Sequence, residues 1–167
     1  MNISLIGMMG SGKSTIGKLL AENLSFSFID TDEEIVRLEK TSINEIFEKK
    51  GEDYFRQIEK NVLEATINRD NIVISTGGGI VKFDDNIQLL KEKSKVFYLK
   101  VRPEILYNRV KNNSERPLLN VDDMKNRIIN LLNERNKKYE QAHVIINAEQ
   151  EPEIVVKEII ENILWEK

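Results

Sequence analysis

One short stretch near the start of the chain, Gly7 to Ser14, limits the possible folds more than any other feature. Its sequence, GMMGSGKS, fits the pattern G-x-x-x-x-G-K-[ST], and it lies between an apolar run at residues 2–6 and a helical pattern at residues 14–23. A phosphate-binding loop requires this strand–loop–helix context, so a chance glycine-rich turn is a poor alternative. The sequence therefore predicts a buried strand that leads into a phosphate loop and then a helix.

The residue types in this loop indicate a nucleoside triphosphate as the ligand. Glycines let the backbone curl until several N–H groups and the positive end of the helix face phosphate oxygens. Lys13 is expected to reach the β and γ phosphates, and the Ser14 hydroxyl is expected to bind Mg²⁺. We expect the nucleotide to be held by Gly10, Ser11, Gly12, Lys13, Ser14 and Thr15.

Short apolar runs and helical patterns alternate along the rest of the chain. Strands are expected at residues 2–6, 26–29, 71–75, 95–101 and 143–147. Helices are expected at 14–23, 35–38, 41–50, 53–68, 85–92, 103–111, 122–139 and 151–165. Parallel strands need crossover connections, so the pattern predicts an α/β fold with a five-stranded parallel sheet covered on both faces, in a single domain over residues 1–167.

Composition narrows the class of ligand. The formal charge of −3 and the pI of about 5.4 argue against a nucleic-acid partner, because phosphate-backbone affinity needs clustered Lys and Arg. The chain has no cysteine, which excludes a disulfide scaffold, a thiolate zinc site and a cysteine nucleophile. We see no targeting segment and no membrane span, and we expect a cytoplasmic protein that binds small molecules.

Two carboxylates, Asp30 and Asp32, follow the second predicted strand, and they have two possible roles. If the strand continues to Asp32, both side chains point to one side, where one could serve a metal and the other an acceptor. Alternatively, the pair caps the next helix and complements its dipole. The neighbouring phosphate loop favours the first role.

A second glycine-rich segment, Gly77-Gly78-Gly79, follows the third predicted strand. Three consecutive glycines provide bare N–H groups and room for close approach of a ligand, although a simple turn remains an alternative. The chain lacks an apparent D-x-x-G or N-K-x-D element, so a GTPase switch is a poor interpretation.

These motifs occur in an order and spacing that resemble the shikimate kinase family over essentially the whole chain. The one departure is Asn136-Lys137-Lys138 after Arg135, where the family more often has proline or alanine directly after the arginine. The motifs are Gly12-Lys13-Ser14-Thr15, Asp30-Thr31-Asp32, Gly51-Glu52 with Phe55-Arg56 and Glu59, Thr76 to Gly79, Arg116-Pro117-Leu118-Leu119, and Arg135 with Tyr139.

The resemblance implies an activity and a fold. It implies transfer of the γ-phosphoryl group of ATP to the 3-hydroxyl of shikimate, with Mg²⁺ as cofactor, on the route to chorismate and the aromatic amino acids. It also implies a three-layer P-loop kinase fold with a mobile lid at about residues 112–122 and a helical substrate-binding segment at about residues 31–60. A monomer is the expected state.

The resemblance also assigns roles to single residues. It implies catalytic roles for Lys13, Asp32 and Arg116, and contacts of Arg109 and Arg116 with ATP. It implies Mg²⁺ binding by Ser14 and Asp30. It places shikimate among Asp32, Arg56, Gly77, Gly78, Gly79 and Arg135. Arginines suit a carboxylate because the guanidinium offers paired donors.

Other interpretations of the sequence stay open. Another small-metabolite kinase, such as a gluconate kinase, would share the phosphate loop, and a catalytically silent relative would still bind nucleotide. The adenine site is the least determined, with Arg109 and the loop from Asn147 to Pro152 as candidates. His143, the single histidine, is expected to be structural or at the surface, and Trp165 is expected to pack.

Overall fold

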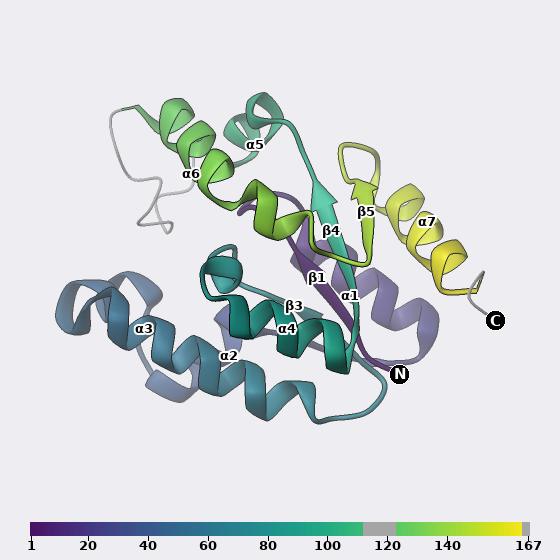
Figure 1. Cartoon of the computed structure of the whole chain (residues 1–167), viewed down its shortest axis with the longest axis horizontal. Coiled ribbons are helices and arrows are strands. Elements are labelled where there is room, and N and C mark those ends of the chain that lie inside the picture. Colours follow the sequence, from purple (N-terminus) through teal and green to yellow (C-terminus); the bar gives the residue numbers. More distant parts are fainter. Residues whose placement is uncertain (112–122, 165–167) are drawn as a thin grey trace.

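Strands and helices alternate along the chain in the order expected from its sequence (Figure 1). The computed structural model describes residues 1–111 and 123–164. The strands are β1 (Ile3–Ile6), β2 (Ser27–Asp30), β3 (Ile72–Ser75), β4 (Lys95–Lys100) and β5 (Val144–Asn147). The helices are α1 (Lys13–Leu24), α2 (Thr31–Glu39), α3 (Ile43–Ile67), α4 (Asp84–Lys93), α5 (Pro103–Val110), α6 (Met124–Tyr139) and α7 (Pro152–Leu164), with a short 3-10 turn at Ile80–Lys82.

The five strands form one parallel sheet in the order β2-β3-β1-β4-β5, so the predicted α/β fold with a five-stranded parallel sheet is confirmed. The chain passes from β1 to β2 at the edge, returns to β3, and then crosses to β4. Ligands bind at such a reversal, outside the carboxyl ends of the strands. The register sets Asp30 beside Ser75 and Ser75 beside Leu5, which aligns the ends of three neighbouring strands.

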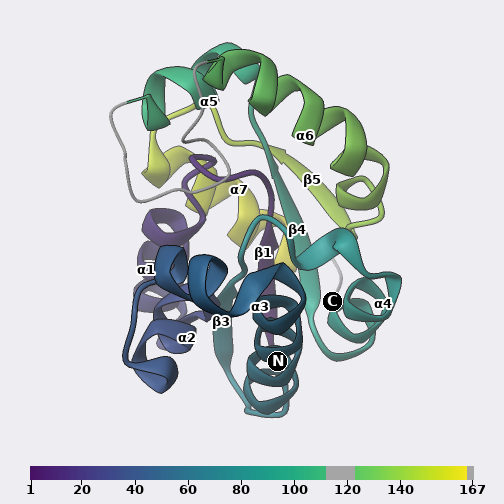
Figure 2. The same ribbon diagram turned by 90° about the vertical axis from the view of Figure 1, so that its left-hand side faces the viewer.

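Helices cover both faces of the sheet, as Figure 2 shows. On one face, Leu5 and Phe97 belong to an apolar cluster that includes residues of α1 and α7. On the other face, Ile74 and Tyr98 pack with residues of α3, α4 and the end of α6. Residues of the inner strands β1, β3 and β4 are buried on both faces, because neighbouring side chains alternate between the faces, which explains the unbroken apolar runs in these strands.

Two helix boundaries bear on the site. Gly51, the predicted end of a helix, has φ 83° and ψ 172°, so it breaks α3 into the two helical segments that the sequence predicted. The second strand ends at Asp30, and Asp32 lies in the first turn of α2. The strand therefore does not continue to Asp32, which was the condition for both carboxylates to point to one side. Instead, the Asp30 side chain caps α2 by accepting hydrogen bonds from the N–H groups of Asp32 and Glu33.

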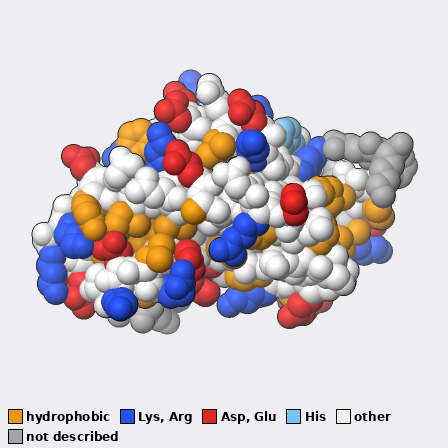
Figure 3. Space-filling model, turned by 90° about the horizontal axis from the view of Figure 1, so that it is seen from below, with side chains coloured by type: hydrophobic (Ala, Val, Ile, Leu, Met, Phe, Trp, Pro, Cys, Tyr) orange, Lys and Arg blue, Asp and Glu red, His pale blue; other side chains and the backbone are white. Residues whose placement is uncertain are grey.

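The surface carries both signs of charge. On the face in Figure 3, acidic and basic side chains lie interspersed with apolar ones. Exposed ion pairs occur on the surface, such as Lys49 with Glu45 on α3. Within residues 1–111 and 123–164, no helix combines the length and the hydropathy needed to cross a membrane. The predicted lid at residues 112–122 and Trp165 lie outside the described residues.

Candidate active site

A cavity of about 850 Å³ opens at the carboxyl ends of β1, β2 and β3. The phosphate loop forms one wall, the Gly77–Gly79 turn forms the floor beside it, and α2 and α3 form the opposite wall. The sequence-predicted residues that line this cavity are Gly10, Gly12, Lys13, Ser14, Thr15, Asp30, Asp32, Arg56, Gly77, Gly78 and Gly79. Phe47 and Phe55 add an apolar side to the same space.

The phosphate loop has the curled backbone that its glycines predict. Gly10 and Gly12 adopt positive φ angles of 81° and 93°, and Gly12 is the residue directly before α1. The Lys13 ammonium folds back over the loop, where it donates to the carbonyl oxygens of Gly7 at 2.8 Å and Met8 at 2.9 Å. Ser11 is fully buried, and its hydroxyl lies 3.4 Å from the same ammonium. The positive end of α1 and a lysine thus share one wall of the cavity.

Oxygen ligands gather where α1 meets the ends of β2 and β3. The Asp30 Oδ2 atom accepts hydrogen bonds from the hydroxyls of Ser14 at 2.5 Å and Ser75 at 2.9 Å, while Oδ1 caps α2. One oxygen of Asp30 therefore caps the helix, and the other faces the hydroxyls of Ser14 and Ser75. A carboxylate and a hydroxyl suit Mg²⁺, which prefers oxygen ligands and keeps several waters. No cluster of three or more acidic or histidine side chains in the described residues could hold a metal by itself.

Asp32 and Glu59 approach the glycine turn from two helices. A Cβ atom added to Gly77 would lie 2.7 Å from Glu59 Oε1 and 2.8 Å from Asp32 Oδ1, so any larger residue here would displace these carboxylates. Glu59 is only 1% exposed. Burial raises the pKa of Glu59, and the neighbouring Arg56 lowers it again in part. The acceptor side of the cavity therefore holds two carboxylates within reach of one turn.

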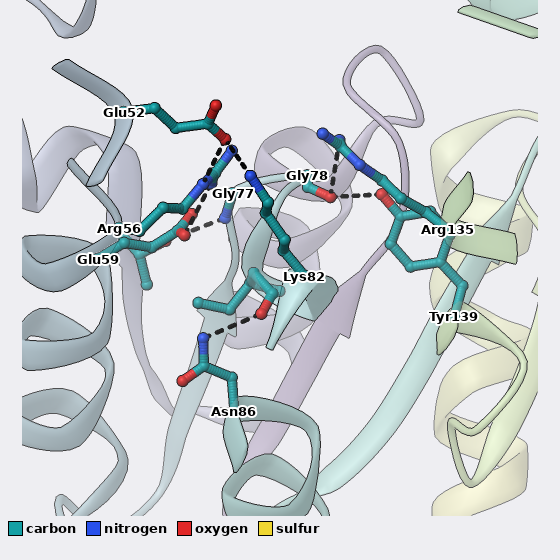
Figure 4. A network of polar contacts seen from close by, with 11 residues as sticks. Glu52, Arg56, Glu59, Gly77, Gly78, Lys82, Asn86, Arg135 and Tyr139 are labelled. Carbon is teal, nitrogen blue, oxygen red and sulfur yellow. Dashed lines mark hydrogen bonds and ion pairs between the residues drawn. The ribbon is translucent and has the colours of Figure 1, made fainter. Parts of the chain in front are cut away.

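Arg56 lies in a chain of charges that Figure 4 shows from close by. Its Nη1 atom donates to Glu59 at 2.8 Å, and its Nε atom donates to Glu52 at 3.3 Å. Lys82, which follows the glycine turn, donates to the same Glu52 oxygen at 2.7 Å and is the main cause of the lowered pKa of Glu52. A Cβ atom on Gly79 would collide with the Arg56 guanidinium, so this group rests directly on the turn.

Arg135 and Tyr139, both on α6, meet the turn from the other side. Each donates a hydrogen bond to the carbonyl oxygen of Gly78, Arg135 at 3.2 Å and Tyr139 at 2.5 Å (Figure 4). Both side chains are buried. The guanidinium of Arg135 is thus held at the edge of the same glycine turn that contacts Arg56.

Arg109 lies at the outer end of the phosphate loop. It donates to the carbonyl oxygens of Gly10 at 3.2 Å and Ala148 at 3.3 Å. The structure therefore brings together Arg109 and the loop after β5, the two elements that the sequence proposed for the adenine. Arg116, the predicted third catalytic residue, lies outside the described residues.

Comparison with known proteins agrees with this arrangement. The family profile described as "Shikimate kinase" matches residues 9–164. A curated shikimate kinase from Persephonella marina is 45% identical over 162 residues, which are 95% of this chain and 96% of the relative. This chain belongs to the shikimate kinase family. A curated shikimate kinase from Aquifex aeolicus is 43% identical over 162 residues, with 96% of this chain and 94% of the relative covered.

Solved structures agree with the fold. The shikimate kinase of Acinetobacter baumannii, solved in complex with shikimate, has a TM-score of 0.97 and 38% identity, with 99% of this chain and 94% of that chain covered. A deoxyadenosine kinase from M. mycoides, solved with bound dATP, has a TM-score of 0.63 at 20% identity, which shows a shared fold alone. The three-layer P-loop kinase fold that the resemblance implied is therefore confirmed for the described residues.

Some residues around the cavity were not singled out from sequence. Glu59 was recognised as part of a motif but given no role, although its i, i+3 spacing from Arg56 on a helix predicts contact. Tyr139 was likewise part of a motif without a role, and it meets the site through a contact with distant Gly78. Ser75 and Lys82 join the site only through contacts with segments far away in the sequence. His143 fits a structural role, since its Nδ1 atom accepts a hydrogen bond from the Val96 N–H group.

Proposed function

We propose that this protein transfers the γ-phosphoryl group of ATP to the 3-hydroxyl of shikimate, giving shikimate 3-phosphate and ADP. The observation that carries the proposal is the shared cavity in which the phosphate loop faces Asp32 and Arg56 across the Gly77–Gly79 turn. A donor site and an acceptor site that share one cavity allow direct transfer in line. The Acinetobacter baumannii relative was solved in complex with shikimate, which supports the choice of acceptor.

The acceptor half suits a small ring with one carboxylate and several hydroxyls. Arg56 and Arg135 offer guanidinium donors for the carboxylate, and the glycine turn admits the ring at close range. Asp32 orients the reacting hydroxyl and takes its proton late. A carboxylate is too weak a base to deprotonate an alcohol in advance of bond formation.

The donor half supplies positive charge to the phosphoryl group during its transfer. Phosphoryl transfer proceeds through a loose transition state, so positioning and charge on the equatorial oxygens carry most of the rate. Lys13 exchanges its contacts with the Gly7 and Met8 carbonyls for phosphate oxygens, and the amides at the start of α1 face the same phosphates. Arg116 is proposed to complete this set, and Arg109 to lie against the nucleotide.

Magnesium would be held by Ser14 directly and by Asp30 through a bound water. When bound, it neutralises the charge that develops on the β and γ phosphate oxygens. The oxygen cluster of Asp30, Ser14 and Ser75 fits a hard cation, because the hydroxyl of Ser14 already points at the carboxylate. A monomeric state, a cytoplasmic location and the absence of a nucleic-acid partner remain predictions.

The test is release of ADP by the purified chain with ATP and Mg²⁺. Shikimate should stimulate ADP release strongly, while gluconate should leave it at the level without acceptor. Stimulation by gluconate alone would support the other small-metabolite kinase. Nucleotide binding without turnover on any acceptor would support the catalytically silent relative.

The role of Asp32 has its own test. Asp32→Asn should lower kcat with shikimate by about a hundredfold or more, because the amide cannot accept the proton. Asp53→Asn is the matched control, since Asp53 is an exposed carboxylate on α3 outside the cavity. Equal turnover of the two variants would rule out Asp32 as the base.

A further inference from the structure

The hydroxyl of Tyr139 contacts both the glycine turn and the phosphate loop. Tyr139 is the last residue of α6, and its side chain is fully buried. The hydroxyl donates to the Gly78 carbonyl at 2.5 Å and lies 3.9 Å from the sulfur of Met8 in the phosphate loop. Burial raises the pKa of Tyr139 to about 12, so the group remains a neutral donor near neutral pH.

Gly78 is the point where the glycine turn meets the phosphate loop. A Cβ atom at this position would lie 3.3 Å from Met9 N and 3.4 Å from the Gly7 carbonyl oxygen. The backbone of the turn therefore packs directly on the backbone of the loop. Any rotation of the Gly78 peptide therefore changes the position of the Gly77–Gly79 turn relative to the phosphate loop.

The hydrogen bond from Tyr139 determines the direction of one peptide plane. The peptide between Gly78 and Gly79 is planar and trans, so its C=O and N–H groups point in opposite directions. With the carbonyl held against α6, the Gly79 N–H points away from α6. Glycine itself offers little resistance to rotation, so an external contact must supply the restraint.

Arg135 donates to the same carbonyl at 3.2 Å, so this oxygen accepts hydrogen bonds from two side chains of α6. If Arg135 also serves a ligand, its guanidinium must divide its donors between that ligand and the turn. Neither Arg135 nor Tyr139 belongs to the residues that line the cavity. Tyr139 has a single hydroxyl proton, which it donates to the Gly78 carbonyl, whereas the guanidinium of Arg135 keeps further N–H donors. The Tyr139 donor is therefore committed to the protein.

We propose that the Tyr139 hydroxyl is a positioning group that holds the Gly77–Gly79 turn in register with the phosphate loop. It acts through the Gly78 carbonyl and does not touch the substrate. The inference rests on the proposed function only for the identity of the acceptor. It predicts that loss of one hydroxyl, without loss of the ring, impairs acceptor binding and transfer but not ATP binding.

The experiment compares Tyr139→Phe with Tyr98→Phe. Tyr98 is a matched control because its ring stacks on Tyr139 at 5.0 Å, it is also fully buried, and its hydroxyl contacts Asn136 instead of the turn. For Tyr139→Phe we expect the KM for shikimate to rise about five- to tenfold and kcat to fall, with the KM for ATP unchanged. Tyr98→Phe should keep all three constants at the wild-type level.

A second measurement needs no substrate. The amide NMR signals of Gly77, Gly78 and Gly79 in the free protein should shift in Tyr139→Phe and stay in place in Tyr98→Phe. Unshifted signals in Tyr139→Phe overturn the inference, whatever the kinetics show. A lowered Tm with equal rises in the KM of both substrates also overturns it, because general packing would then explain the effect.

The two measurements separate this inference from the proposed function. If wild-type protein does not phosphorylate shikimate, the proposed function fails, while shifted glycine signals in Tyr139→Phe still support the restraint. If wild-type protein is active and Tyr139→Phe matches it in every constant, the restraint has no role in the reaction and the inference fails alone.

Discussion

Replacement of Arg56 by methionine isolates the electrostatic role of the buried pair Arg56–Glu59. The two side chains are 5% and 1% exposed and meet at 2.8 Å. Methionine keeps most of the apolar stem of arginine but removes the charge, so Glu59 stays buried beside a neutral neighbour. Removing one partner of a buried ion pair costs about 3–5 kcal/mol of stability.

Glu59 can escape this cost by taking up a proton, and the free energy of that step depends on pH. Each pH unit above the ordinary glutamate pKa of about 4.3 adds about 1.4 kcal/mol, so protonation costs about 4 kcal/mol at pH 7 and about 1 kcal/mol at pH 5. The folded-state pKa of Glu59 in the variant lies above its unfolded value. The variant is therefore most stable below the pKa that Glu59 has in the unfolded state, and its stability falls as the pH rises toward the pKa that Glu59 has in the folded state.

Urea denaturation followed by circular dichroism at pH 5 and pH 7 measures both effects. Arg56→Met should lose about 4 kcal/mol at pH 7 and much less at pH 5, and the double variant with Glu59→Gln should recover most of the loss. Lys49→Met is the control, because it breaks an equally short but exposed pair with Glu45 in the same helix and should leave the stability nearly unchanged at both pH values. The reasoning is refuted if Arg56→Met loses the same free energy at both pH values, or if Glu59→Gln recovers nothing.

Three further perturbations test other parts of the site. Lys13→Ala should lower kcat by roughly a hundredfold or more with both substrates saturating, since Lys13 is proposed to act on the transferred phosphoryl group; a wild-type kcat would rule out that role. Gly79→Ala adds a Cβ atom that collides with the Arg56 guanidinium, and the φ angle of Gly79, −93°, allows alanine without backbone strain. The KM for shikimate should therefore rise about tenfold or more, and an unchanged KM would contradict the contact. Burial raises the pKa values of Tyr98 and Tyr139 to about 12, so the free energy of unfolding should be constant up to a pH of about 10 and decline above it. Urea denaturation at a series of alkaline pH values should show a shallower decline for Tyr139→Phe, and equal slopes would show that Tyr139 does not contribute.

Local sequence was sufficient to predict the helices and strands and the phosphate loop that forms the donor half of the cavity. The phosphate loop is one continuous segment whose glycines and lysine act on their own neighbours, so its curled backbone follows from eight residues. The break at Gly51 was predictable for the same reason, because a positive φ is a property of a single residue. Ser42 caps α3 in the same local way, by accepting a hydrogen bond from the Glu45 N–H three residues later.

The role of Asp30 could not be decided from the neighbouring sequence alone. Its sequence context fits both a helix cap and a metal ligand, and the structure assigns one oxygen to α2 and directs the other to Ser14 and Ser75. The contact with Ser75 spans 45 residues and depends on the register of β2 against β3. The sequence of β2 by itself does not predict that register.

By itself, then, the sequence determined the order of strands and helices, the parallel sheet and the phosphate loop, because these depend on short-range periodicity and on the freedom of single glycines. Only the tertiary structure decided how Glu59, Lys82 and Tyr139 join the cavity. Lys82 reaches Glu52 across 30 residues and Tyr139 reaches Gly78 across 61, and such pairs meet because packed helices and parallel strands bring them to one edge of the sheet. Side chains that act through distant backbone groups carry no local signature, so the fold has to be known before their chemistry can be assigned.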